Sequence, residues 1–258
     1  MDKFDSIFFG GTGWNLLWSF GASKKLHELG FNKKIKRVGG LSCGALSALA
    51  FIDSASYEVG IVQSEQLFKE RFLFSRSFIK KFKYYADNFL NKSVIEDIKK
   101  SNVEFNIAYA NLKLTSLKLK IISDFSSRQD LIDKCVAGCN IPLILGVHNT
   151  IFPKISNGDY VLDAGFLGDS YHRWDEKTLV VAPTEKSNEN TIGGNYTISS
   201  ALGLRNNKMS DKSLFLSGYL DASKWYADHY LYNNAWQNES NWHEKTETFD
   251  EFLKRGDL

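Results

Sequence analysis

The chain has 258 residues, 43% of them hydrophobic, which is enough to bury one sizeable core, so we expect a single domain over residues 1–258. Its 32 lysines and arginines nearly balance 30 aspartates and glutamates, and the net charge of +2 gives no reason to expect a nucleic-acid partner. The acidic start is unlike a signal peptide and no apolar run reaches about 18 residues, so we expect a cytoplasmic protein.

Strand, glycine turn and helix follow one another twice within the first 50 residues. The apolar run 6–9 predicts a strand, the glycines of 10–13 predict a turn, and apolar residues at helical spacing predict a helix that ends at Gly30. Residues 35–38 predict a second strand. Gly39 and Gly40 then indicate the turn before a small-residue helix over 45–50.

The rest of the chain continues to alternate between the two periodicities. Helical patterns cover 56–100, 129–137 and 217–236, and strand patterns cover 103–110, 114–122, 160–162 and 179–181. We therefore expect an α/β fold, a three-layer α/β/α domain with a mostly parallel central sheet.

Ser42 is the first candidate catalytic residue because it stands at the centre of Gly40-Leu41-Ser42-Cys43-Gly44. This pentad follows a predicted strand and precedes a predicted helix, the setting of a nucleophile elbow. Glycines that merely close a strand-to-helix turn would explain the pentad equally well. An ordinary α/β-hydrolase has several strands before its elbow, whereas position 42 leaves room for two.

The first glycine turn offers flexible backbone that could direct N–H groups at an oxyanion. A dinucleotide-binding fingerprint would need glycine at position 16, where Leu16 stands, and an acidic residue at the end of the second strand, where Gly39 stands. A Walker loop would need Gly-Lys-Ser/Thr, which is missing. We therefore interpret the turn as an oxyanion loop rather than a nucleotide site.

A serine nucleophile needs a base, and the histidines do not supply an obvious one. None of the five has a spacing that singles it out; they are His27, His148, His172, His229 and His243. Asp163 follows the apolar strand 160–162. At such a position a carboxylate can be held rigidly and desolvated, and desolvation raises its pKa. A turn aspartate that caps backbone N–H groups is the alternative reading of Asp163.

Four segments, in this order, resemble the patatin-like phospholipases, a family that includes patatin, adiponutrin and bacterial relatives. The segments are FFGGTGWNLLWSFGASKKL, GLSCGALSALA, AGCNIP and YVLDAG, and together they span residues 5 to about 182. They are similar to the family's oxyanion segment, its nucleophile elbow, the segment before its second catalytic residue and its Asp-Gly motif.

The resemblance implies a serine acyl hydrolase that cleaves ester bonds of phospholipids, lysophospholipids or neutral glycerolipids. It implies a catalytic dyad of Ser42 and Asp163, an acyl-serine intermediate and no cofactor or metal. Backbone N–H groups of Gly11, Thr12 and Gly13 would form the oxyanion hole. Gly40, Cys43 and Gly44 would complete the nucleophile elbow.

Three residues depart from the family pattern. Thr12, Leu16 and Ala164 stand where the family has glycine. Thr12 is expected to be strained if it must take the positive φ of a glycine. These departures keep open an alternative, a catalytically degenerate lipid- or protein-binding module with the same scaffold.

Residues 69–85 interleave aromatic and basic residues, which is typical of a segment that lies in an anionic headgroup layer. Peripheral membrane contact through this segment is one interpretation, and an amphipathic helix with its aromatic side chains in the core is the other. Cys43 is interpreted as a small packing residue. Cys135 and Cys139, one helical turn apart, are interpreted as a buried stripe.

Overall fold

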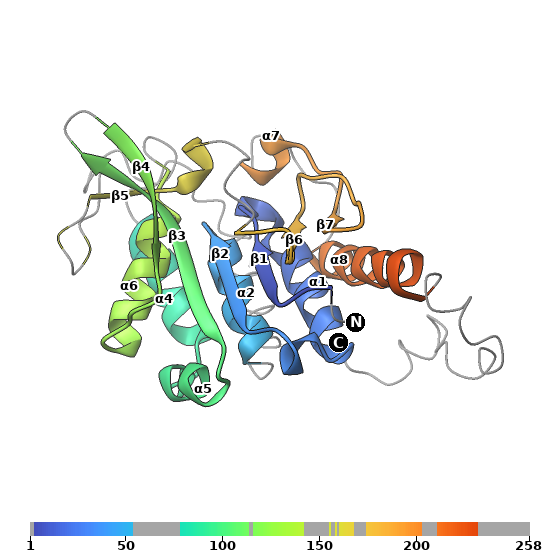
Figure 1. Ribbon diagram of the computed structural model, residues 1–258. Helices are drawn as coiled ribbons and strands as arrows, with labels where there is room; N and C mark the ends of the chain where they lie inside the picture. Colours follow the sequence, from blue (N-terminus) through green and yellow to red (C-terminus); the bar gives the residue numbers. More distant parts are fainter. Residues whose placement is uncertain are drawn as a thin grey trace.

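The computed structural model describes residues 3–53, 78–113, 116–141, 155, 158, 160–167, 174–202 and 211–231 (Figure 1). The strands are β1 (Ser6–Phe9), β2 (Arg37–Leu41), β3 (Glu104–Lys113), β4 (Ser116–Ile122), β5 (Tyr160–Leu162), β6 (Thr178–Ala182) and β7 (Thr191–Gly193). The α-helices are α1 (Leu16–Glu28), α2 (Gly44–Ile52), α4 (Phe78–Phe89), α5 (Val94–Lys100), α6 (Arg128–Gly138), α7 (Ile198–Ala201) and α8 (Asp211–Tyr226). Short helical turns are η1 (Gly13–Asn15), η2 (Phe31–Lys33), η3 (Ala164–Leu167) and η5 (Ala227–Leu231).

The strands form one mixed sheet in the order β4-β3-β2-β1-β6-β7, with β5 also paired to β3. Strands β1, β2, β3, β6 and β7 run parallel, while β4 and β5 run antiparallel to β3. Helices flank this sheet (Figure 1). The expected α/β class with a mostly parallel central sheet is confirmed.

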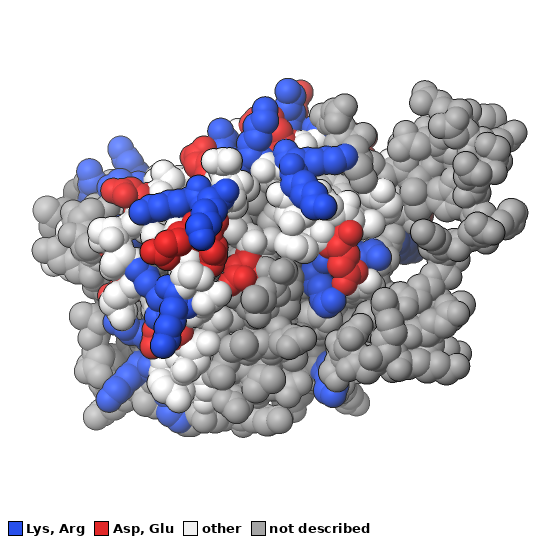
Figure 2. Space-filling model, turned by 90° about the horizontal axis from the view of Figure 1, so that it is seen from below, with Lys and Arg blue, Asp and Glu red and all other residues white. Residues whose placement is uncertain are grey.

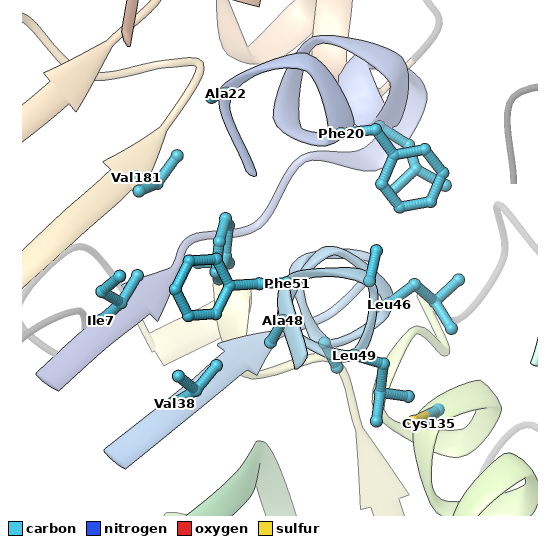
Figure 3. Close-up of a cluster of buried hydrophobic side chains, with 14 of the residues drawn as sticks. Ile7, Phe20, Ala22, Val38, Leu46, Ala48, Leu49, Phe51, Cys135 and Val181 are labelled. Carbon is cyan, nitrogen blue, oxygen red and sulfur yellow. The ribbon is translucent and has the colours of Figure 1, made fainter. Parts of the chain in front are cut away.

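The main hydrophobic core lies between the sheet and the long helices. Alternation along β1 turns Ile7 and Phe9 toward this core and Phe8 toward the other face. Figure 3 shows α2 lying over the strands that carry Ile7 and Val38, with Phe20 of α1 nearby. The small residues of α2 allow this helix to pack closely on the sheet.

A smaller cluster covers the other face of the sheet. It consists of Phe8, Leu41, Ala108, Ala110, Leu162 and Ala164, with Leu112, Leu117, Leu119, Leu167 and Trp174 packed against it. The short helix η3 contributes to this side. The Trp174 ring stands edge-on to Phe8, with 5.1 Å between the ring centroids.

Helix α8, late in the sequence, packs on α1 through two glycines. A Cβ on Gly21 would lie 1.9 Å from the carbonyl oxygen of Phe215, and one on Gly218 would lie 1.8 Å from that of Trp18. The Trp18 indole also donates a hydrogen bond to Oδ2 of Asp221 at 2.7 Å. The backbones of the two helices therefore approach closely enough to exclude any side chain at these positions.

The structure corrects the boundary expected for the second strand. Gly39 and Gly40 lie inside β2 and do not form the turn after it. A Cβ on Gly39 would meet the Trp174 ring at 2.7 Å, and one on Gly40 would meet the backbone nitrogen of Ala45 at 2.4 Å. These two glycines permit close packing at the end of a strand, and the turn itself falls at Ser42, two residues after Gly40.

Other boundaries differ from expectation because the elements are short or extend beyond their periodic part. Helix α8 begins at Asp211 rather than at residue 217, and residues 232–236 of the expected helix lie outside the described residues. β7 and α7 were not predicted, since three or four residues carry too little periodicity to recognise.

Charges of both signs are interspersed on the surface seen from below (Figure 2). Exposed ion pairs among the described residues include Lys3–Glu189 at 3.1 Å and Arg37–Glu104 at 3.3 Å. Exposed pairs of this kind contribute at most about 1 kcal/mol each. Among the helices that the structure describes, none combines the length and apolarity needed to span a membrane.

Candidate active site

Strands β2 and β5 meet end to end along one edge of β3. Parallel strand β2 ends with Leu41 opposite Ala108, and antiparallel strand β5 ends with Leu162 opposite Ala110. Both lie on the same edge, because β4 occupies the other one. Only Tyr109 separates the two positions on β3. The residue that follows each strand therefore emerges next to Tyr109, one from each direction.

The residue that follows β2 is Ser42, in a backbone conformation rare for residues other than glycine. Its φ is 58° and its side chain is 5% exposed. The helix that follows starts at Gly44, where a Cβ would lie 2.2 Å from the carbonyl oxygen of Gly10. Ser42 thus occupies a sharp strand-to-helix turn pressed against the end of β1. Such strained positions concentrate at functional sites.

The residue that follows β5 is Asp163, which is 4% exposed and lies close enough to the Ser42 hydroxyl for that hydroxyl to favour the ionised carboxylate. The Gly165 N–H donates to its Oδ1 at 2.8 Å. Burial raises the pKa of the Asp163 carboxyl to about 6, although the Ser42 hydroxyl and the Gly165 N–H act in the opposite direction. The structure therefore joins the two residues predicted as nucleophile and base in one contact.

The first glycine loop lies next to this pair. A Cβ on Gly11 would lie 2.9 Å from Cδ2 of Leu41 and 3.9 Å from Cβ of Ser42. Within the described part of the chain, the backbone N–H groups of Gly11, Thr12 and Gly13 have no hydrogen-bond acceptor. Unpaired N–H groups this close to a serine can donate hydrogen bonds to a negatively charged oxygen and stabilise it.

The expectation of backbone strain at Thr12 is wrong. Thr12 has φ −102° and ψ −28°, which any residue adopts, and the positive φ of this loop falls on Gly13 at 47°. The other two departures from glycine serve packing: Leu16 begins α1 in the main core, and Ala164 is buried in the smaller cluster. Thr12 itself is fully buried, and its Oγ1 has no partner among the described residues.

Two positioning contacts were not recognised from the sequence. Asn140, which follows α6 within the segment AGCNIP, accepts a hydrogen bond from the Asp163 N–H at 2.9 Å through its carbonyl. Tyr109, fully buried, is the residue of β3 next to which both strands end. Only contacts between segments far apart in the sequence reveal these roles: a loop hydrogen bond for Asn140 and the strand pairings for Tyr109.

The described histidines lie elsewhere. Nδ1 of His27 lies 3.0 Å from the carbonyl oxygen of Phe51, at the end of α2 remote from Ser42. The ring of His229 packs against Trp225. His148, His172 and His243 lie outside the described residues.

The cysteines are all free thiols. Cys135 and Cys139 are buried, as expected for a helical stripe, and Cys43 is partly buried against the main core. Among the described residues no group of three or more His, Cys, Asp or Glu side chains could hold a metal ion.

The basic-aromatic segment 69–85 is described only from residue 78 onward, as the start of α4. Phe82 and Tyr85 are buried in the main core, and Lys83 forms an ion pair with Asp133 at 2.5 Å. This part follows the amphipathic-helix alternative. Residues 69–77 of the proposed membrane contact lie outside the described residues.

Fold and site together define a class: an α/β protein with a mostly parallel sheet, in which a serine and a buried carboxylate meet near the carboxyl ends of β1 and β2. The chain is similar in structure to VipD from Legionella pneumophila, with a TM-score of 0.53 and 11% sequence identity. That match covers 88% of this chain and 67% of VipD. At this identity the likeness establishes the fold alone.

Two further structures overlap with most of this chain at lower scores. They are the type III effector protein ExoU, with a TM-score of 0.43, and the ExoU–SpcU complex from Pseudomonas aeruginosa, with 0.42, both at 13% identity. The matches cover 88% and 86% of this chain but 53% and 52% of those chains, so this chain spans about half of ExoU. No protein-family model matches the sequence, and no curated protein is significantly similar to it.

Proposed function

We propose that the protein is a serine acyl hydrolase that cleaves ester bonds of lipids through Ser42 and Asp163. The observation that carries this proposal is the proximity of the two: the hydroxyl of a serine at φ 58° lies beside a buried carboxylate whose pKa is about 6 and favours its ionised form. A base must lie within hydrogen-bond reach of the proton it removes and have a pKa near the working pH. Asp163 meets both conditions.

In the proposed reaction, the Ser42 hydroxyl oxygen attacks the ester carbonyl while Asp163 takes its proton. The N–H groups of Gly11, Thr12 and Gly13 stabilise the negative charge that develops on the carbonyl oxygen. Asp163 then returns its proton to the leaving alcohol, and an acyl group remains on Ser42. Water hydrolyses this acyl-serine with Asp163 again acting as the base.

The substrate class rests on the sequence resemblance to patatin-like phospholipases. We propose lipid esters, namely phospholipids, lysophospholipids or neutral glycerolipids, as substrates. The likeness to the VipD fold supports a scaffold of this kind. Of the segment 69–85, residues 69–77 remain our proposal for contact with the lipid surface.

A fluorophosphonate probe tests the nucleophile. We expect the wild-type protein to be labelled and Ser42→Ala to be unlabelled, while Asp163→Asn is labelled at least about a hundredfold more slowly. Ser47→Ala is the matched control, because Ser47 is a buried serine of α2 whose hydroxyl has no partner among the described residues. Equal labelling of wild type and Ser42→Ala would sink the proposal.

The same experiment decides against the alternative, a binding module without activity. A folded wild-type protein that takes up no probe and releases no fatty acid from mixed lipid vesicles would favour that module. If labelling occurs, lipid profiling with wild type and Ser42→Ala identifies the ester that is cleaved.

A further inference from the structure

The three cysteines of the chain gather behind the Ser42–Asp163 pair. Cys43 is close enough to Cys139 to raise the pKa of its thiol, and Cys135 interacts electrostatically with both. The end of α6 lies beside the end of β2: a Cβ on Gly138 would lie 3.8 Å from the carbonyl oxygen of Ala108, and Ala108 pairs with Leu41. Cys135 belongs to α6, and Cys139 follows its last residue. Figure 3 shows Cys135 pointing from α6 toward Leu46 and Leu49 of α2. The thiol group thus lies where α2 and α6 meet.

Cys43 and Cys139 each lie next to one residue of the proposed dyad. Cys43 is bonded to Ser42 in sequence. Cys139 directly precedes Asn140, whose carbonyl oxygen holds the Asp163 N–H at 2.9 Å. The negative charge of Asp163 contributes to raising the pKa of the Cys139 thiol, after burial and the Cys43 contact, so these groups are close in space. The proposed dyad does not use either thiol.

The thiols differ in their access to solvent. Cys43 is partly exposed, whereas Cys135 is 1% and Cys139 2% exposed. Burial is also the main reason why the pKa of both buried thiols is raised, which keeps them protonated and slow to react with an oxidant in solution. A small oxidant that enters the site therefore meets Cys43 first.

We infer that Cys43 and Cys139 are a thiol pair that hydrogen peroxide converts to a disulfide, and that this disulfide reversibly separates Ser42 from Asp163. In the first step the Cys43 sulfur attacks the peroxide, which leaves a sulfenic acid and one molecule of water. In the second step the Cys139 sulfur displaces that hydroxyl group, which forms the S–S bond and a second water. Two thiols lose two electrons and two protons to one peroxide.

The disulfide would disturb the site because its short S–S bond draws Cys43 and Cys139 together. Two sulfurs joined in a disulfide are about 2 Å apart, much closer than the sulfurs of two thiols in contact. Drawing them together pulls either the turn at Cys43 or the end of α6 at Asn140, and each displacement acts on a neighbour in the dyad. A shift of about 1 Å can lower a rate by about a hundredfold. The inhibitory part of this inference rests on the proposed function, and disulfide formation does not.

The experiment treats the purified protein with hydrogen peroxide and then with dithiothreitol. We expect peptide mapping by mass spectrometry to find a Cys43–Cys139 link that has lost two hydrogen atoms and is reversed by the reductant. We expect fluorophosphonate labelling to fall at least about tenfold on oxidation and to return on reduction.

Cys139→Ala and Cys135→Ala are matched variants, one helical turn apart in the same buried region. We expect Cys139→Ala to form no link, to keep its labelling after brief oxidation at low peroxide, and to expose a Cys43 sulfenic acid that dimedone traps. Cys135→Ala should still form the link and lose labelling. If either variant is unfolded, the peptide map of the wild-type protein still decides whether the link forms.

Absence of a Cys43–Cys139 link in oxidised wild-type protein overturns the inference, and so does a complete link with unchanged labelling. If reduced wild type is not labelled at all, the proposed function has failed while the peptide map still judges the thiol pair. In that case hydrogen exchange at Asp163 replaces the activity readout. Faster exchange of this amide after oxidation supports the separation, and unchanged exchange contradicts it.

Discussion

At the scale of single residues, the site depends on a balance of burial and hydrogen bonding at Asp163. Burial favours the protonated acid, while the Ser42 hydroxyl and the Gly165 N–H favour the carboxylate. The resulting pKa of about 6 leaves the group ionised at neutral pH and still basic enough to accept a proton. An exposed aspartate at its ordinary pKa of 3.8 would be a weaker base.

This balance predicts the pH dependence of catalysis. Protonated Asp163 cannot accept the Ser42 proton, so we expect kcat/KM for a soluble ester to fall about tenfold for each pH step of one below about 6. Rates measured between pH 4.5 and 8 give the profile, and circular dichroism over the same range shows whether the protein stays folded. A flat profile from pH 5 to 7 in folded protein would contradict the role of Asp163 as the base.

At the scale of elements, the site is assembled by strand ends and by glycines that let elements approach. The sequence predicted both strand-to-helix turns, because glycine clusters between apolar runs are a local signal. It did not predict which strands would be neighbours. The pairing of β5 with β3 joins segments far apart in the sequence. The apolar strand before Asp163, and then the resemblance to a known family, pointed to the partner of Ser42 before any geometry did.

The same reasoning explains the misplaced turn in β2. Gly39 and Gly40 resemble turn residues in sequence, yet each is glycine because another group occupies the space of a Cβ. Trp174 fills this space at Gly39, and it lies far along the chain. No local pattern distinguishes a glycine needed for a turn from one needed for a close approach.

The α1–α8 contact gives a prediction at this scale. In an isolated helix Gly218→Ala would stabilise by about 1 kcal/mol, but here the new Cβ would lie 1.8 Å from the Trp18 carbonyl oxygen. We therefore expect a loss of about 2–4 kcal/mol in the free energy of unfolding, measured by urea denaturation. Leu220→Ala, at a 48% exposed position of the same helix, should change it by less than about 1 kcal/mol. Greater stability of Gly218→Ala would show that the two helices do not pack this closely.

At the scale of the whole molecule, the proposed dyad lowers stability at neutral pH. The difference between pKa 3.8 and about 6 at Asp163 corresponds to about 3 kcal/mol. The folded state binds more protons than the unfolded state within this window, so this group's contribution to stability is present below about pH 4 and lost as pH rises through about 6. A functional site that weakens the fold is common in enzymes.

Replacement of this carboxyl by an amide tests the linkage. We expect Asp163→Asn to raise the free energy of unfolding by about 1–3 kcal/mol at pH 7.5, because Asn cannot become a buried charge. The gain should shrink toward zero near pH 4, where the wild-type carboxyl is protonated. Urea denaturation at both values measures it. An equal effect at pH 4 and pH 7.5 would mean that ionisation of Asp163 is not the cause.

The end-to-end meeting of β2 and β5 has a further consequence for how this site can change. The pairing of β2 and β5 with β3 fixes where Ser42 and Asp163 emerge. The spacing of these two residues therefore depends on the register of the three strands. Insertions in the segments that join these strands need not alter that spacing. Loops around such a pair can diverge in length and sequence, and with them the choice of substrate, while the two reacting groups keep their distance.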